Sequence, residues 1–148
     1  MPRNGYSGKI LRVDLSSGRI DAEPTARYAG LFPGGRALAA KLHWDGVSPE
    51  TGAFNPENRL IMATGPMAGV HSIGGSRWGI FAKSPFPSPE QFCYGNLGGG
   101  FGAELKFAGY DALVIEGRAE RPAVIAIRDG CAEIIDGAPW WGMGAIEA

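Results

Sequence analysis

The sequence predicts a mainly β domain with short helices, an α+β fold whose strands form a two-layer, largely antiparallel, sandwich-like base. Its 148 residues correspond to one domain, and its 45% hydrophobic content is enough for a packed core. The 24 Gly and 11 Pro residues are spread between short apolar runs, which is typical of turns that join short strands. We therefore treat residues 1–148 as a single domain, or as a truncated part of one.

Short apolar or alternating runs predict about eight strands. The runs span residues 9–15, 19–23, 59–64, 77–82, 92–94, 112–116, 123–128 and 132–135. The turn Ser16-Ser17-Gly18 joins the first two runs and Asp129-Gly130 joins the last two, so both pairs should be hairpins. Because most runs are joined by turns and not by long helical crossovers, a Rossmann-type sheet is disfavoured.

Three short helices are predicted over residues 25–31, 36–44 and 101–108, with an irregular loop over residues 45–58. Thr25 is placed to cap the first helix. Leu38 and Leu42 share one face of the second, and Gly109 ends the third. Residues 143–148 resemble the first turn of a further helix, so we expect the chain to be a piece of a longer polypeptide or to need a partner.

Charge and hydropathy argue against nucleic acid and membrane partners. Lys and Arg total 14 and Asp and Glu total 15, and this net charge of −1 offers no basic surface for nucleic acid. The longest apolar run, Ala123–Ile127, is far shorter than the roughly 20 residues of a membrane-spanning helix. The N-terminus lacks the apolar stretch of a secretory signal, so we expect a cytoplasmic protein.

The titratable residues show no catalytic or metal-binding arrangement. Cys93 and Cys131 stand without a Cys-x-x-Cys pair or a His at ligand spacing, which predicts buried free thiols and not a zinc or iron–sulfur site. The other candidates are expected to be structural or solvated: His43, His71, Glu104, Asp111 and Glu116. No nucleophile elbow is present, so a hydrolase triad has no support.

The most informative stretch is the glycine-rich segment 95–102, which leads directly into a predicted helix. Residues without a Cβ let backbone N–H groups approach a phosphate closely, although the same pattern suits an ordinary strand-to-helix turn. It matches neither the P-loop nor the dinucleotide-binding motif. Arg77 and Trp78 open a strand nearby, where the guanidinium could bind a phosphate or a planar ring and the indole could form a wall. The alternative is a surface Arg77 with Trp78 in the core.

Five blocks of sequence, in order along the chain, carry a resemblance to a known family. They are Gly8–Leu15, Gly34–Ala40, Glu57–Pro66, Lys83-Ser84-Pro85 and Gly95–Ala119. The last block, which begins Gly-Asn-Leu-Gly-Gly-Gly-Phe-Gly-Ala-Glu-Leu-Lys, is long and highly specific. Together they resemble the N-terminal domain of the tungsten-dependent aldehyde ferredoxin oxidoreductases.

The resemblance implies a sandwich-like base on which a tungsten (or molybdenum) bis-pterin cofactor lies, with helical domains closing over it. It implies that Arg77 contacts the pterin near an iron–sulfur cluster. It implies that Asn96 helps to hold a magnesium ion that bridges the two pterin phosphates, through its side chain or its backbone carbonyl. It also implies that Gly98, Gly99 and Gly100 lie next to this magnesium and phosphate site. The face that carries Trp78, Tyr94 and the glycine loop should then be an exposed apolar surface that other domains cover.

The resemblance also implies that this chain works only as part of a larger enzyme. In the family, the [4Fe–4S] ligands and the acid–base residues lie in later domains, so we assign no catalytic residue here and expect the isolated chain to be inactive. Its partners would be the remaining domains or a catalytic subunit, with ferredoxin as electron acceptor of the whole enzyme and a homo-oligomer as a further option. The implied reaction converts an aldehyde and water to a carboxylic acid.

Two alternatives stay open. The segment 86–93 is richer in Pro than the family's glycine-rich link, which leaves the subfamily and the substrate open. The first alternative is therefore that the chain is part of a benzoyl-CoA-reductase-like relative. The second alternative is a non-catalytic β-rich assembly module that has lost the cofactor. The presence of Arg77, Asn96 and the three glycines favours the enzyme part.

Overall fold

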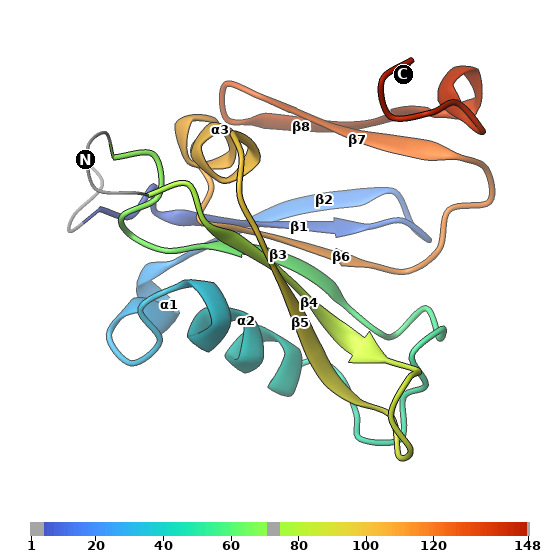
Figure 1. The fold of residues 1–148 in the computed structure, drawn as a ribbon, viewed down its shortest axis with the longest axis horizontal. Coiled ribbons are helices and arrows are strands. Elements are labelled where there is room, and N and C mark those ends of the chain that lie inside the picture. The colour runs from blue at the N-terminus through green and yellow to red at the C-terminus, as the bar shows by residue number, and fades with distance from the viewer. Residues whose placement is uncertain (1–4, 71–74, 148) are drawn as a thin grey trace.

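A computed structural model describes residues 5–70 and 75–147 and shows a mixed six-stranded sheet with further elements on both faces (Figure 1). The strands are β1 (Lys9–Asp14), β2 (Arg19–Pro24), β3 (Leu60–Thr64), β4 (Trp78–Ser84), β5 (Gln91–Leu97), β6 (Ala112–Glu116), β7 (Ala123–Arg128) and β8 (Cys131–Asp136). The helices are α1 (Ala26–Ala29), α2 (Gly35–Trp44) and α3 (Phe101–Phe107), followed near the end by a 3-10 turn, η1 (Ala138–Trp140).

The strand order in the large sheet is β2-β1-β6-β3-β4-β5, and β7 and β8 form a separate two-stranded sheet. Within the described residues β1 and β6 run parallel, and every other pair of neighbouring strands is antiparallel. The predicted α+β, largely antiparallel fold is therefore confirmed. The strand predicted over residues 92–94 is longer than expected, because β5 pairs with β4 along its whole length.

Alternation along the strands gives the sheet two apolar faces. On the first, which we call the α2 face, α2 lays Leu38 and Leu42 against Ile61, Phe81 and other side chains of the sheet. The exposed fraction is 2% or less for each of these four residues, so the predicted apolar stripe of the second helix is confirmed. Figure 1 shows α1 and α2 together beneath the sheet.

The opposite face, which we call the α3 face, is covered over β1 and β6 by α3 and the β7–β8 hairpin (Figure 1). Leu11, Val13 and Leu113 meet Leu105 of α3, and Ile125 from the hairpin packs against the same cluster. The two β layers of the predicted base are thus present, although the second layer contains only two strands within the described residues.

A buried ion pair joins four segments of the chain at one end of the sheet. Asp111 and Lys106 lie 2.9 Å apart, and the two side chains are only 2% and 7% exposed. The carboxylate of Asp111 also accepts hydrogen bonds from the backbone N–H of Gly8 and from the Thr25 hydroxyl, at 2.8 and 2.7 Å. The predicted structural role of Asp111 is therefore confirmed. Thr25 occupies the N-cap position of α1 as predicted, but its hydroxyl bonds Asp111 and makes no capping hydrogen bond.

Two other sequence expectations are corrected. Cys93 and Cys131 are exposed free thiols, not buried ones, because both lie on outer strands of their sheets. Residues 144–147 form a single turn, closed by the hydrogen bond from the Glu147 N–H to the Gly144 carbonyl, and do not start a helix. In the part of the chain that the structure describes, no helix is long and apolar enough to cross a membrane.

Candidate functional site

The predicted site residues converge at one end of the sheet, where β4 begins and β5 ends. In the β4–β5 pairing Trp78 lies opposite Leu97 and Gly79 lies opposite Asn96. Arg77 directly precedes β4, so its Cα lies within about two strand spacings of Asn96, or roughly 7–10 Å. The antiparallel hairpin thus brings together two residues that are well separated in the sequence.

The glycine loop that follows β5 is open to ligands. Gly98, Gly99 and Gly100 are exposed, and a Cβ built on any of them would meet no atom within 4 Å. Gly99 has φ +85°, a left-handed conformation that other residues rarely adopt. The loop therefore presents backbone to solvent at a place where side chains are absent. Asn96 belongs to β5 and has no positive φ, so the left-handed turn is made by the glycine and not by the asparagine.

Trp78 fixes the position of this loop and of α3. Its indole Nε1–H donates a hydrogen bond to the Gly98 carbonyl at 3.1 Å. The centroid of its ring lies 4.5 Å from the ring centroid of Phe101, the first residue of α3. A Cβ on Gly102 would come within 2.9 Å of the Trp78 Cβ, so the helix needs glycine there to approach the strand. Trp78 is half-buried and braces the loop, so the alternative that placed it in the core is wrong.

Arg77 and Asn96 both have exposed side chains. Among the described residues, neither side chain makes a hydrogen bond or an ion pair. A guanidinium and a carboxamide beside an open glycine loop are donors suited to a phosphate, and the carboxamide or backbone oxygen suits Mg²⁺. The residues present thus fit a phosphate-bearing group with its magnesium ion.

The start of α2 lies at the same end of the sheet. A Cβ on Gly34 would meet the Thr64 carbonyl at 2.8 Å and the Gly65 Cα at 3.2 Å, so the helix begins beside the end of β3. From its first turn Arg36 reaches over the ring of Tyr94 on β5, with Cζ 3.5 Å from the ring centroid. Sequence reasoning did not assign Arg36 to the site, because the contact between α2 and β5 is a tertiary one.

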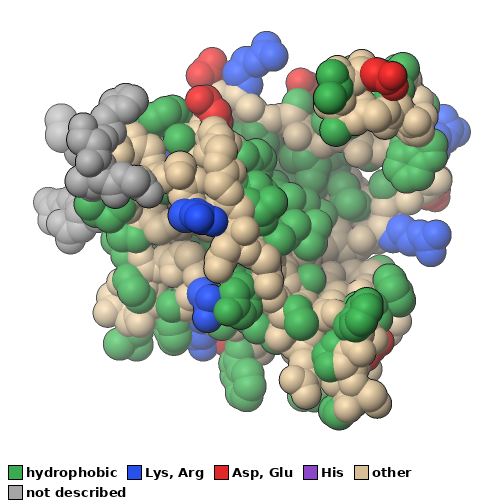
Figure 2. Space-filling view, in the orientation of Figure 1, with side chains coloured by type: hydrophobic (Ala, Val, Ile, Leu, Met, Phe, Trp, Pro, Cys, Tyr) green, Lys and Arg blue, Asp and Glu red, His purple; other side chains and the backbone are tan. Residues whose placement is uncertain are grey.

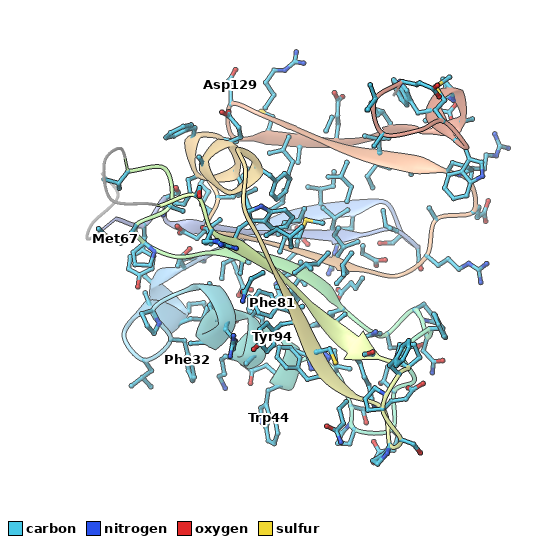
Figure 3. All side chains as sticks on the ribbon, viewed as in Figure 1. Phe32, Trp44, Met67, Phe81, Tyr94 and Asp129 are labelled. Atoms are coloured by element: carbon cyan, nitrogen blue, oxygen red, sulfur yellow. The ribbon has the colours of Figure 1, made fainter. Side chains whose placement is uncertain are left out.

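The α3 face of β4 and β5 is largely uncovered. A shallow hollow of about 220 Å³ is lined by Leu60, Ile80, Cys93 and their neighbours. A second hollow of about 390 Å³ lies between α3 and the β7–β8 hairpin, and Phe101 and Glu104 line it. Hydrophobic side chains gather beneath the hairpin in Figure 2. The expected apolar surface near Trp78 is present in Leu97 and Phe101, which are 38% and 40% exposed. The prediction that Tyr94 shares this face is wrong, because Tyr94 pairs with Phe81 and lies on the opposite, α2 face (Figure 3).

Two of the remaining predicted polar residues, Glu116 and His43, have specific partners in the structure. Over residues 5–70 and 75–147, no three His, Cys, Asp or Glu side chains are grouped so that they could hold a metal ion. Glu116 pairs with Arg59 at 2.8 Å, which confirms a structural role. His43 is partly buried against Phe92, with ring centroids 4.9 Å apart, and His71 lies outside the described residues.

Comparisons with known proteins agree on one family. The family model "Aldehyde ferredoxin oxidoreductase, N-terminal domain" matches residues 10–148. The tungsten-containing aldehyde ferredoxin oxidoreductase of Pyrococcus horikoshii is 42% identical over 139 residues, which cover 93% of this chain and 23% of that protein. The corresponding Pyrococcus furiosus enzyme is 42% identical over 97% of this chain and 24% of its own length.

More distant relatives share the same domain. An aliphatic sulfonate oxidoreductase, WOR-like subunit, of Pyrococcus furiosus is 34% identical over 96% of this chain and 23% of that protein. The solved active-site complex BamBC of benzoyl coenzyme A reductase with 1,5-dienoyl-CoA superposes with a TM-score of 0.92 at 35% identity, over 99% of this chain and 22% of that one. The chain spans about a quarter of the length of these relatives. The chain belongs to the N-terminal domain family of the aldehyde ferredoxin oxidoreductases.

Proposed function

We propose that this chain is the tungstopterin-seating domain of an aldehyde:ferredoxin oxidoreductase, which converts an aldehyde and water to a carboxylic acid and passes the electrons to ferredoxin. The observation that carries the proposal is the convergence of Arg77, Asn96 and the open loop Gly98–Gly100 at one end of the sheet. The 42% identity with enzymes named as tungsten-containing supports the reaction class.

Each of these residues has a role that its chemistry suits. The guanidinium of Arg77 would bind a pterin phosphate through paired N–H groups. The backbone of Gly98–Gly100 would approach the same groups without steric hindrance, and an oxygen of Asn96 would hold the magnesium ion. When bound, the tungsten or molybdenum bis-pterin supplies redox chemistry that the protein's own side chains lack.

The chemistry would be completed by residues outside this chain. The [4Fe–4S] ligands and the proton-transfer groups would come from the remaining domains or from a partner subunit, within a cytoplasmic enzyme. The 148-residue chain alone would then be inactive and would bind no tungsten or iron in stoichiometric amount. Elemental analysis of the purified chain tests this, and a full equivalent of either metal would contradict it.

A benzoyl-CoA-reductase-like function is the second candidate, because the TM-score of 0.92 covers nearly the whole chain. In that case the same end of the sheet would seat the same kind of cofactor for an aromatic thioester substrate. The complete, cofactor-loaded enzyme distinguishes the two candidates when it is assayed with an aldehyde and with an aromatic acyl-CoA. The higher identity to the aldehyde enzymes favours activity with the aldehyde.

The proposal is tested by substitutions in the complete enzyme. Arg77→Ala should lower tungsten content and total activity in parallel, with the activity per bound tungsten unchanged, because Arg77 seats the group and transfers no proton. Asn96→Ala should act in the same way but more weakly. Arg121→Ala removes an equal charge from the opposite end of the sheet and should leave both quantities unchanged. Full tungsten content and normal turnover in Arg77→Ala would refute the assignment.

A further inference from the structure

Arg36 is an exposed arginine held in place by an aromatic ring. Its Cζ lies over the Tyr94 ring at 3.5 Å from the ring centroid, a distance typical of a guanidinium stacked on an aromatic face. In that stacked arrangement the N–H donors around its edge stay available for a partner in the same plane. Among the described residues, no carboxylate pairs with it. Figure 3 shows Tyr94 on the side of the sheet that α2 covers.

The stack lies at the same end of the sheet as the candidate site. Tyr94 and Asn96 are two residues apart on β5 and therefore share the α2 face, about 7 Å from one another. Gly34 contacts the backbone at Thr64 and Gly65, which places the first turn of α2 at the end of the sheet where β4 begins. Arg36 thus lies against Tyr94, two residues along β5 from Asn96, and Arg77 lies directly before β4 at the same end of the sheet.

We propose that Arg36 is a second phosphate-binding arginine of this site, which Tyr94 holds in position to bind phosphate oxygens jointly with Arg77. A ligand with two phosphate groups carries several negative charges, and a pair of guanidiniums compensates them better than one. The identity of the ligand as a pterin diphosphate rests on the proposed function. The stack removes much of the conformational freedom that Arg36 would otherwise lose on binding.

The competing explanation is that Arg36 only clamps α2 onto β5. Three substitutions separate the two roles. Arg36→Lys keeps the charge and the cation–π contact but loses the planar fork, and Tyr94→Leu loses the stack but keeps the guanidinium. Arg121→Ala removes one positive charge at the far end of the sheet and controls for the general electrostatic effect.

The first measurement is an NMR titration of the purified chain with magnesium pyrophosphate at low ionic strength, with the fold of each variant checked by circular dichroism. We expect Arg36→Ala to weaken binding about tenfold, and Arg36→Lys and Tyr94→Leu about threefold each, with Arg121→Ala unchanged. Equal affinity in the wild type and Arg36→Ala, or equal weakening in Arg36→Ala and Arg121→Ala, would overturn the proposal. So would the absence of pyrophosphate binding by the wild type.

The second measurement is the tungsten content of the complete enzyme. Arg36→Ala should lose tungsten, while its thermal midpoint without cofactor stays within the range of the Arg121→Ala control. If Arg77→Ala loses pyrophosphate affinity and tungsten but Arg36→Ala loses neither, this inference fails and the proposed function stands. If neither variant loses tungsten, the proposed function fails as well.

Discussion

The central strands and the β4–β5 arm of the same sheet are built differently. Residues of β1 and β6 are buried on both faces, under α2 on one side and under α3 and the β7–β8 hairpin on the other. On β5, in contrast, no residue is buried, and only its α2 face has a cover. The comparison indicates that the central strands supply stability, whereas the arm carries the exposed residues that can bind a ligand.

The largest effect should come from the buried ion pair beside the central strands. Lys106→Met would leave the Asp111 carboxylate buried without its cation, and we expect a loss of about 3–5 kcal/mol in the free energy of unfolding. Lys41→Met breaks an exposed pair with Asp45 and should cost about 0.5 kcal/mol or less. Urea unfolding of both variants tests this. A similar cost for the two would show that the buried pair contributes no more than a surface pair.

Two adjacent residues of β4, one on each face of the sheet, test the difference between a covered and an uncovered face within a single strand. Phe81 is 2% exposed and contacts the α2 core, so Phe81→Ala should cost about 3–5 kcal/mol. Ile80 lies on the uncovered α3 face, and Ile80→Ala should cost about 1 kcal/mol. Urea unfolding measures both losses of unfolding free energy. Equal losses would show that the two faces of the arm are equally packed, against the expectation from the hollow over Ile80.

A smaller, pH-dependent effect should come from His43. Its Nε2 is buried and has no hydrogen-bond partner among the described residues. Burial lowers the pKa of His43 below 6.5, and the positive charges of Arg59 and Lys83 lower it further. As the pH falls, His43 therefore binds a proton in the unfolded chain before it does so in the folded chain. The contribution of neutral His43 to the free energy of unfolding, present above about pH 7, is lost as the pH falls through 6.5.

The replacement His43→Gln tests this because glutamine does not titrate. The wild type should lose more unfolding free energy than the variant between pH 7.5 and pH 5.5, both measured in urea. His71 is present in both proteins, so its contribution cancels in the difference. Identical pH dependence in the two proteins would show that His43 is not the responsible group.

Most elements of the fold were predictable because their patterns are local. The hairpin turn at Asp129-Gly130 and the alternation along β1 each lie within a few residues. What the sequence did not indicate depends on pairing across the fold. Thr25 bonds Asp111 from 86 residues away, and the parallel pairing of β1 with β6 joins distant segments.

The candidate site follows the same division. Arg77, Asn96 and the glycines could be named from their types and from the family resemblance, and the β4–β5 register explains why they meet. Arg36 could not be singled out, because its importance depends on the packing of α2 against Tyr94. The roles of Trp78 as a donor to Gly98 and as a brace for α3 likewise require the folded chain.

The central claim is that the glycine loop binds a ligand and contributes little to the fold. Gly99 and Gly18 are matched for a test, since both have positive φ, at +85° and +71°, and neither has an atom within 4 Å of a built Cβ. Gly99→Val and Gly18→Val should each cost about 1–2 kcal/mol of stability through backbone strain. Tungsten content and unfolding midpoint, measured on the same preparations of the complete enzyme, decide the question. We expect tungsten to be lost in Gly99→Val and retained in Gly18→Val, and equal tungsten in the two variants would show that the glycine loop does not bind the cofactor.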